Sequence, residues 1–367
     1  MTREFRKDIR GRGASSNVSN RYDSLAYEAT EEDFDNYLED EKSVLRTQVF
    51  KDSSRTIITS NKSPDIGFSY SINAYRGCEH GCSYCYARPT HEYLGMSPGL
   101  DFESKIFVKE EAPQLLREAL MKKSWQPEVI FMSGITDCYQ PLERKMQLTR
   151  GCLKVLAEFK NPVGMITKNA LVTRDVDILQ EMAAWSGAKV YLSITSLDPD
   201  LARRLEPRTS HPEARLKAIE TLAKAGVPVG VNVAPCIPGL NDHEMPQILK
   251  AAADAGATSA GFTPLRLPST VLPIFTEWLE VHDPLKKDKV LNYVRDIRGG
   301  KLNDPNFGSR MRGEGPRADA MAQMFKLYTR KYGLNMKDLN LSVAHFKRPP
   351  AHLDPSRSHG QLSFNIE

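Results

Sequence analysis

Three cysteines lie close together in the sequence, at Cys78, Cys82 and Cys85, in a C-x3-C-x2-C pattern with Tyr84 and Tyr86 on either side of the last one. A [4Fe–4S] cube needs one ligand for each iron, and thiolates are its usual ligands. Three thiolates leave one iron without a protein ligand. Such an open iron can bind a small molecule and pass an electron into it. The spacing therefore favours a redox cluster with one exchangeable position.

A zinc site is the main alternative, because structural zinc takes four Cys or His ligands, often from two C-x2-C pairs. This chain has one such pair, so His80 or His91 would have to complete the tetrahedron. A disulfide framework does not suit six cysteines in a long chain without a signal peptide. Cys152 lies on the apolar face of a predicted helix, where packing is expected, while Cys236 fits either packing or the site.

Composition and charge limit the class of protein. The 367 residues are enough for one large α/β barrel with appendages, and 40% hydrophobic residues support a buried core. No apolar run reaches the length of a membrane span and the N-terminus lacks a signal-peptide core, so we expect a cytoplasmic protein without membrane contact. Residues 1–22 carry six basic and two acidic side chains, whereas residues 23–367 carry 44 of each. The body therefore has no overall charge bias toward nucleic acid.

The pattern of residues divides the chain into three parts. Residues 1–45 combine a basic, Gly/Ser/Asn-rich start with seven acidic residues between Glu31 and Glu41, which predicts a disordered, charged segment. From residue 60 to 268, apolar strand-like runs alternate with helical patterns. The alternation stops there, and residues 269–367 are predicted to form a mostly helical extension with a proline-containing tail.

Six strands and five helices are predicted within the alternating part. The strands cover residues 67–74, 129–133, 163–167, 190–195, 229–234 and 259–265. The helices cover residues 114–121, 149–159, 175–185, 212–225 and 244–255, with apolar positions recurring at helical spacing. This order implies parallel strands with right-handed crossovers, in either an open doubly wound sheet or a barrel. In the extension, residues 270–297 and 317–332 are predicted to be helical.

Polar residues stand where the strands end, although the interior of a barrel usually takes Val, Ile and Leu. Tyr191, Ser193 and Thr195 share one face of the fourth strand, and Lys168 directly follows the third. Because parallel strands end at the same edge, these side chains are expected to meet there. A lysine can neutralise a carboxylate at this edge, and hydroxyl groups can hydrogen-bond it. Solvated strand ends are the alternative.

The sequence resembles the radical S-adenosylmethionine (SAM) enzymes, and within them the spore photoproduct lyase branch. The resemblance rests on the cysteine motif with its two tyrosines and on five further stretches, and it covers about residues 68–265. These stretches are Ile166-Thr-Lys, Leu192-Ser-Ile, Leu205-Glu-Pro-Arg-Thr-Ser, Ala223-Lys-Ala-Gly-Val-Pro-Val-Gly and Val233-Ala-Pro. It implies a partial (β/α)6 TIM-like barrel, a [4Fe–4S] cluster held by the three cysteines, and SAM bound at the free iron.

The resemblance also implies roles for single residues. Lys168 and Ser193 correspond to SAM contacts, and Ala234 corresponds to a backbone contact near the adenine. Ser133 and Thr136, after the second strand, are candidates for further SAM contacts. Tyr84, beside the third cysteine, is expected to cover the cluster and the adenine, with packing as its other role.

One position departs from the lyase pattern. The lyase carries a cysteine after the second strand that returns a hydrogen atom to its thymine-dimer substrate, and Gly134 stands at this place. Cys138 follows four residues later and is a candidate for a displaced hydrogen donor, with packing as the alternative. Among other polar residues, Glu206 and Arg208 form a candidate pair, and Arg310 lies in a glycine-rich loop that could hold a phosphate.

The resemblance predicts a radical reaction. One electron enters the sulfonium, methionine leaves, and a 5′-deoxyadenosyl radical takes hydrogen from a substrate. The electron is expected from a flavodoxin- or ferredoxin-type reductant. The family branch favours a nucleic acid as substrate, while the neutral body favours a protein, peptide or small molecule. A non-enzymatic iron–sulfur electron carrier or a zinc-stabilised binding module is a third hypothesis, against which Lys168 and Ser193 argue.

Overall fold

The computed structural model describes residues 9–22, 45–337 and 340–350. Its centre is a seven-stranded sheet in the order β10-β9-β8-β7-β6-β3-β2, in which all neighbours are parallel except β2, which runs antiparallel to β3 at one edge. The strands are β2 (Ile58–Ser60), β3 (Tyr70–Ile72), β6 (Ile130–Met132), β7 (Val163–Thr167), β8 (Ala188–Ser193), β9 (Val229–Cys236) and β10 (Ser259–Pro264). The predicted partial barrel of six parallel strands is confirmed, and the sheet does not close, because β2 and β10 remain its edges.

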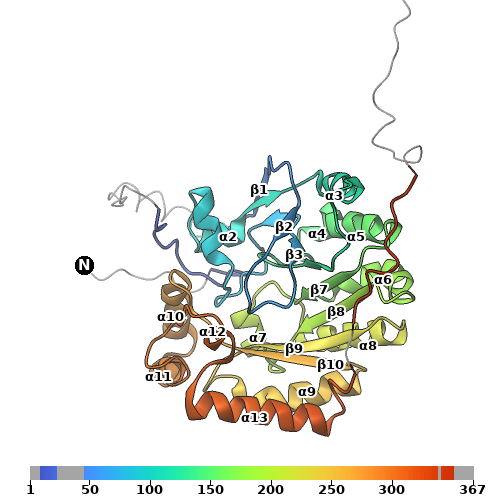
Figure 1. Cartoon of the computed structure of the whole chain (residues 1–367). Coiled ribbons are helices and arrows are strands. Elements are labelled where there is room, and N and C mark those ends of the chain that lie inside the picture. The colour runs from blue at the N-terminus through green and yellow to red at the C-terminus, as the bar shows by residue number, and fades with distance from the viewer. Residues whose placement is uncertain (1–8, 23–44, 338–339, 351–367) are drawn as a thin grey trace, which may run out of the picture.

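Helices cover the outer face of this sheet (Figure 1). They are α3 (Ala112–Met121), α5 (Leu148–Glu158), α6 (Val176–Ala183), α8 (Pro212–Lys224) and α9 (Met245–Asp254), with short α4 (Glu143–Met146) beside them. The short α7 (Pro199–Leu205) lies apart from these helices, where Leu201 and Leu205 belong to the same buried cluster as Cys82. Each long helix places one apolar side on the strands; in α5, for example, Cys152, Leu153 and Leu156 are fully buried. The strands contribute Val, Ile and Leu to the same core, which makes the strand ends a rigid frame.

A second, three-stranded sheet was not predicted. It has the order β1-β5-β4, formed by β1 (Gln48–Lys51), β5 (Lys105–Val108) and β4 (Tyr75–Arg76). Strands of two to four residues are too short to show an alternating pattern in the sequence, so they are recognised only from the backbone pairing in the structure. Because β4 immediately precedes the cysteines, this small sheet anchors one end of the cysteine-containing segment.

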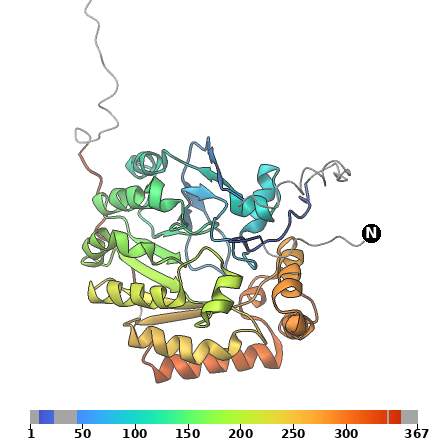
Figure 2. The ribbon, with the colours of Figure 1, turned by 180° about the vertical axis from the view of Figure 1, so that it is seen from behind.

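The extension contains one more break than predicted. Residues 270–297 form two helices, α10 (Val271–His282) and α11 (Lys287–Asp296), separated at Pro284. Asp283, which precedes this proline, is non-helical at φ −142° and ψ 54°, as the residue before a proline tends to be. The last long helix, α13 (Gly315–Lys331), lies along α9 in both views of the ribbon (Figures 1 and 2).

The described part of the segment predicted to be disordered, residues 9–22, is ordered instead. Residues 9–22 pack against the body of the protein, with Arg12, Ala14 and Asn20 buried. They are held by hydrogen bonds to Glu103 and Glu92, partners that lie far along the chain and that composition cannot reveal. Residues 1–8 and 23–44 lie outside the described residues, as does most of the predicted C-terminal tail. Within the described ranges, no helix is both long and apolar enough to span a bilayer.

Candidate functional site

The three cysteines lie on one loop, residues 77–87, between β4 and the 3-10 helix η1 (Arg88–Leu94). Cys78 and Cys82 are buried and Cys85 is half-buried. Burial raises the pKa of Cys85 to about 11 and that of Cys82 well above its ordinary value, and the thiols influence one another electrostatically. The loop thus places three thiols close together, and burial favours the protonated form of Cys82 and Cys85, whose protons a metal would have to replace.

The N-terminal segment and η1 fix the outer side of this loop. The buried guanidinium of Arg88 donates to the carbonyl of Cys82 at 2.8 and 3.0 Å and forms an ion pair with the buried carboxylate of Glu103. Glu103 in turn accepts hydrogen bonds from the amides of Gly13 and Ala14, at 3.0 and 2.9 Å. A side chain at Gly13 would overlap the loop, since its Cβ would stand 1.7 Å from the carbonyl oxygen of Gly81. The packing here requires glycine.

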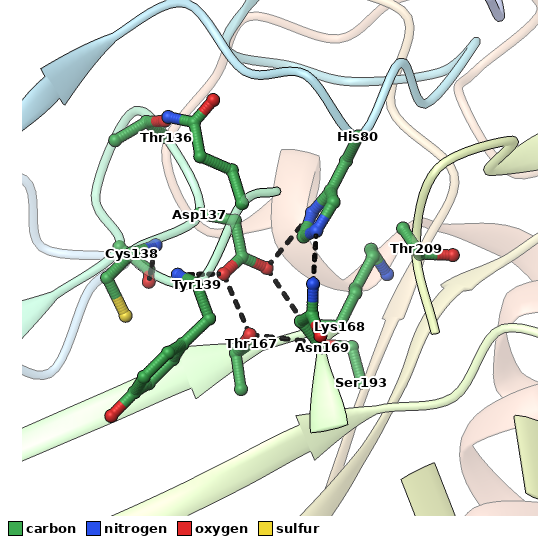
Figure 3. A network of polar contacts seen from close by, with 12 residues as sticks. His80, Thr136, Asp137, Cys138, Tyr139, Thr167, Lys168, Asn169, Ser193 and Thr209 are labelled. Carbon is green, nitrogen blue, oxygen red and sulfur yellow. Dashed lines mark hydrogen bonds and ion pairs between the residues drawn. The ribbon is translucent and has the colours of Figure 1, made fainter. Parts of the chain in front are cut away.

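His80 ties the inner side of the loop to the strand ends (Figure 3). Its imidazole lies 3.4 Å from the carboxylate of Asp137 and 3.3 Å from the amide nitrogen of Asn169. Burial would lower the pKa of His80, but Asp137 and Cys78 reverse this effect and raise it to about 10. Asp137 also accepts from the Thr167 hydroxyl at 2.7 Å and the Lys168 amide at 2.8 Å. His80 thus joins the loop, through Asp137 and Asn169, to the end of β7.

Lys168 extends from the end of β7 to the ends of the two neighbouring strands. Its ammonium group donates to the carbonyl of Ala234 at 2.9 Å and to the Thr195 hydroxyl at 3.3 Å. It also lies 3.2 Å from Glu206 and 5.7 Å from the centre of the Tyr84 ring. The structure therefore brings Lys168, Ala234 and Tyr84 together beside the cysteine loop. Ser193, at the end of β8, is buried and aligned with Asn232 of β9.

Glu206 does not pair with Arg208, the partner predicted from the sequence. Instead of pairing with Arg208, its fully buried carboxylate lies 2.5 Å from Arg215 and accepts hydrogen bonds from Tyr84 and Thr195. Burial would raise the pKa of Glu206, but Arg215 and Lys168 overcome this and hold it well below its usual range. Arg208 pairs with Glu79 of the cysteine loop at 3.2 Å. In the sequence, the only indication of this pair is that Arg215, in α8, follows Glu206 by nine residues.

The candidates after β6 lie at the other side of the loop. The Thr136 hydroxyl donates to the carbonyl of Gly77 at 2.7 Å, which links it to the start of the cysteine loop. The Ser133 hydroxyl accepts from the amide of Cys138 at 3.1 Å. Cys138 is buried in the main core cluster, a location that agrees with the packing alternative for this thiol. Gly134 lies nearer the loop, because Tyr86 donates to its carbonyl at 3.0 Å.

The donor set fits a [4Fe–4S] cluster. Within residues 9–22, 45–337 and 340–350, no three Cys, His, Asp or Glu side chains are placed to hold a single metal ion together. A cubane makes a different demand, because each thiolate binds a different iron. Three thiols on one loop meet it, two of them buried and one half-buried, and Lys168, which favours the thiolate form of both Cys82 and Cys85, supplies a positive charge beside them. His91 is not available as a fourth ligand through Nε2, which lies 3.1 Å from the carbonyl of Lys105.

The chain is similar to several known proteins. The sequence matches the radical SAM superfamily over residues 72–252. An uncharacterized protein of Mycobacterium tuberculosis is 36% identical over 257 residues, which cover 69% of this chain and 75% of that protein. An uncharacterized protein of Methanocaldococcus jannaschii is 31% identical over 199 residues, 54% of this chain and 71% of that one.

Among solved structures, spore photoproduct lyase has the same fold. A mutant of that enzyme with one cysteine replaced by serine superimposes with a TM-score of 0.57 at 18% identity, covering 78% of this chain and 80% of that one. A double mutant of the lyase with bound AdoMet and dinucleoside spore photoproduct gives a TM-score of 0.56 at 16% identity, covering 80% of this chain and 82% of the mutant.

Proposed function

Because this chain belongs to the radical SAM superfamily, we propose that Cys78, Cys82 and Cys85 hold its [4Fe–4S] cluster and that the enzyme acts on a nucleic acid. The observation that carries the proposal is the position of the three thiols on one buried loop beside the ammonium group of Lys168. When bound, the cluster and SAM supply a 5′-deoxyadenosyl radical that abstracts hydrogen. The chain's own residues bind, orient and shield these groups.

Lys168 is the proposed partner of the SAM carboxylate. It is positioned by the Ala234 carbonyl and by Thr195. Glu206 balances the charge of Lys168 and also orients Tyr84, whose ring lies beside the ammonium group. Ser193 and the backbone at Ala234 are proposed to contact the remainder of SAM from the ends of β8 and β9. Ser133 and Thr136 are proposed to complete the contacts from the end of β6.

The nucleic acid as substrate is supported by the shared fold, since the lyase structures include one complexed with dinucleoside spore photoproduct. Gly134, where the lyase pattern has its hydrogen-donating cysteine, argues for a different lesion or a different source of hydrogen. Cys138 is the proposed hydrogen-atom donor, and because it is 5% exposed, the side chains packed around it would have to move before it could reach a substrate. The proposed electron source is a flavodoxin- or ferredoxin-type protein, and the proposed location of the reaction is the cytoplasm.

Anaerobic reconstitution tests the proposal. Protein loaded with iron and sulfide should cleave SAM to 5′-deoxyadenosine when reduced with dithionite. Cys82→Ala should lose this activity and weaken the charge-transfer absorption of the cluster, whereas Cys152→Ala, which changes a buried cysteine of α5, should retain both. Full SAM cleavage by Cys82→Ala would refute the assignment. Damaged and undamaged oligonucleotides in the same assay test the substrate, and product formation from peptides alone would contradict a nucleic acid.

A further inference from the structure

A positively charged cavity of about 570 Å³ lies between the N-terminal segment and the cysteine loop. Its charged lining consists of four arginines and one glutamate: Arg10, Arg12, Arg46, Arg208 and Glu79. Arg10 and Arg12 come from the segment that packs on the loop, Arg46 precedes β1, and Arg208 follows α7. Residues far apart in the sequence therefore create one basic surface at this place.

The positive charge of the cavity is incompletely balanced by the described residues. Glu79 forms an ion pair with Arg208 at 3.2 Å and accepts from the Thr47 hydroxyl at 2.6 Å. Arg12 donates to two backbone carbonyls, those of Glu103 at 2.6 Å and Leu45 at 2.7 Å, neither of which carries a full negative charge. Within residues 9–22, 45–337 and 340–350, no carboxylate forms an ion pair with Arg10, Arg12 or Arg46. Anionic partners are therefore attracted here.

The cavity touches the cysteine loop on the side that faces away from the strand ends. Glu79, in the cavity wall, is the neighbour of Cys78, and the amide of Arg208 donates to the carbonyl of His80 at 3.3 Å. The His80 side chain points the other way, toward Asp137 and Asn169 (Figure 3). None of the proposed SAM contacts lines the cavity. A partner in the cavity would thus reach the loop without displacing SAM or substrate.

We propose that this arginine-lined cavity is the docking surface for an acidic one-electron donor protein of the flavodoxin or ferredoxin type. The inference rests on the proposed function, because it assumes that the loop holds the cluster. The donor loses one electron and the cluster gains it; the electron then enters SAM, whose carbon–sulfur bond breaks. Electrostatic complementarity at such a surface speeds the encounter of the partners and weakens as salt rises. A nucleic acid backbone is less well suited, since substrate chemistry must occur at the strand ends.

Charge reversal at the two exposed arginines tests the docking surface. The double variant Arg10→Glu/Arg46→Glu changes residues that make no ion pair with a described carboxylate, and Lys326→Glu/Arg330→Glu on α13 is the control with the same change in charge. Biolayer interferometry measures the affinity for a bacterial flavodoxin at low and high salt. We expect the double variant to bind at least about 10-fold more weakly at low salt, with the control within about 2-fold of wild type. Thermal unfolding confirms that both variants are folded.

Activity separates failure of this inference from failure of the proposed function. SAM cleavage driven by dithionite needs no docking, so it should be unchanged in the double variant, while cleavage driven by flavodoxin should show a raised KM. Unchanged flavodoxin affinity in the double variant would overturn the docking surface. Loss of affinity for single-stranded DNA with unchanged flavodoxin binding would assign the cavity to nucleic acid instead. Absence of dithionite-driven cleavage in the wild type would refute the proposed function, whatever the binding results.

Discussion

Replacing Glu206 by glutamine should destabilise the protein more than any comparable change at its surface. The carboxylate is fully buried and lies between Arg215 and Lys168, with hydrogen bonds from Tyr84 and Thr195. Glutamine keeps the shape and one acceptor but removes the negative charge. The guanidinium of Arg215, itself 1% exposed, is then left buried without its counter-ion. Removing one partner of a buried pair costs about 3–5 kcal/mol, because the other charge stays desolvated.

A loss of this size is large enough to measure in a domain whose total stability is about 5–15 kcal/mol. It corresponds to a fall in melting temperature of roughly 4–7 °C for a chain of this length, because the entropy of unfolding is about 2.1 cal/mol/K per residue. Circular dichroism of the wild type and Glu206→Gln gives the difference. Glu220→Gln is the matched control, because Glu220 also lies between two cations, Lys217 and Lys224, but on the exposed face of α8. A melting temperature for Glu206→Gln within about 2 °C of wild type would refute the reasoning.

Three further predictions concern the site and the loop. Lys168→Ala should weaken SAM binding about 10- to 100-fold, since a hydrogen bond to a charged group contributes about 1.5–3 kcal/mol. Equilibrium dialysis measures the affinity, with Lys217→Ala on α8 as the control. If the two variants bound SAM equally well, Lys168 would have no role in SAM binding. Gly134→Cys should have a melting temperature within about 2 °C of wild type. The Cβ of the new residue would lie 3.3 Å from the Ser71 hydroxyl and 3.4 Å from the Asn73 side-chain amide, its nearest neighbours. A large fall in the melting temperature would show that the position excludes a thiol. Burial lowers the pKa of His91 from 6.5 to about 4, so the unfolded chain binds a proton below pH 6.5 that the folded protein does not. Stability should therefore fall by about 3 kcal/mol as the pH drops from about 6.5 to about 4, and urea midpoints of His91→Phe should lack this part of the pH dependence.

The sequence predicted those parts of the molecule that local patterns determine. The strand at 163–167 and the helices around Cys152 and Leu222 have the periodicity of their elements, and their bounds agree with prediction within a few residues. The cysteine spacing is likewise local, because one loop must present all three thiols. Lys168 stands out in the sequence because it directly follows the third strand, where a lysine can neutralise a carboxylate, and because it corresponds to a SAM contact in the family that the sequence resembles.

Partners that lie far apart in the sequence could not be predicted in this way. Composition indicated disorder for the basic start of the chain, yet Gly13 and Ala14 bind the carboxylate of Glu103, which lies 90 and 89 residues away. Glu206 was paired with Arg208 because the two are neighbours in the sequence, whereas α8 turns Arg215 toward the carboxylate. A buried charge takes the partner that the fold brings to it, and the fold is a property of the whole chain.

These long-range contacts hold the cysteine loop in a defined shape. Arg88 holds the carbonyl of Cys82 from the outside, and His80 is fixed by Asp137 from the inside. Arg88 and Glu103 form a fully buried ion pair, which is costly to break by removing one partner and so disfavours other arrangements of the loop. The same contacts bring Arg12 and Arg208 to the outer side of the loop, so the network that prepares the thiols for iron also builds the basic surface beside them.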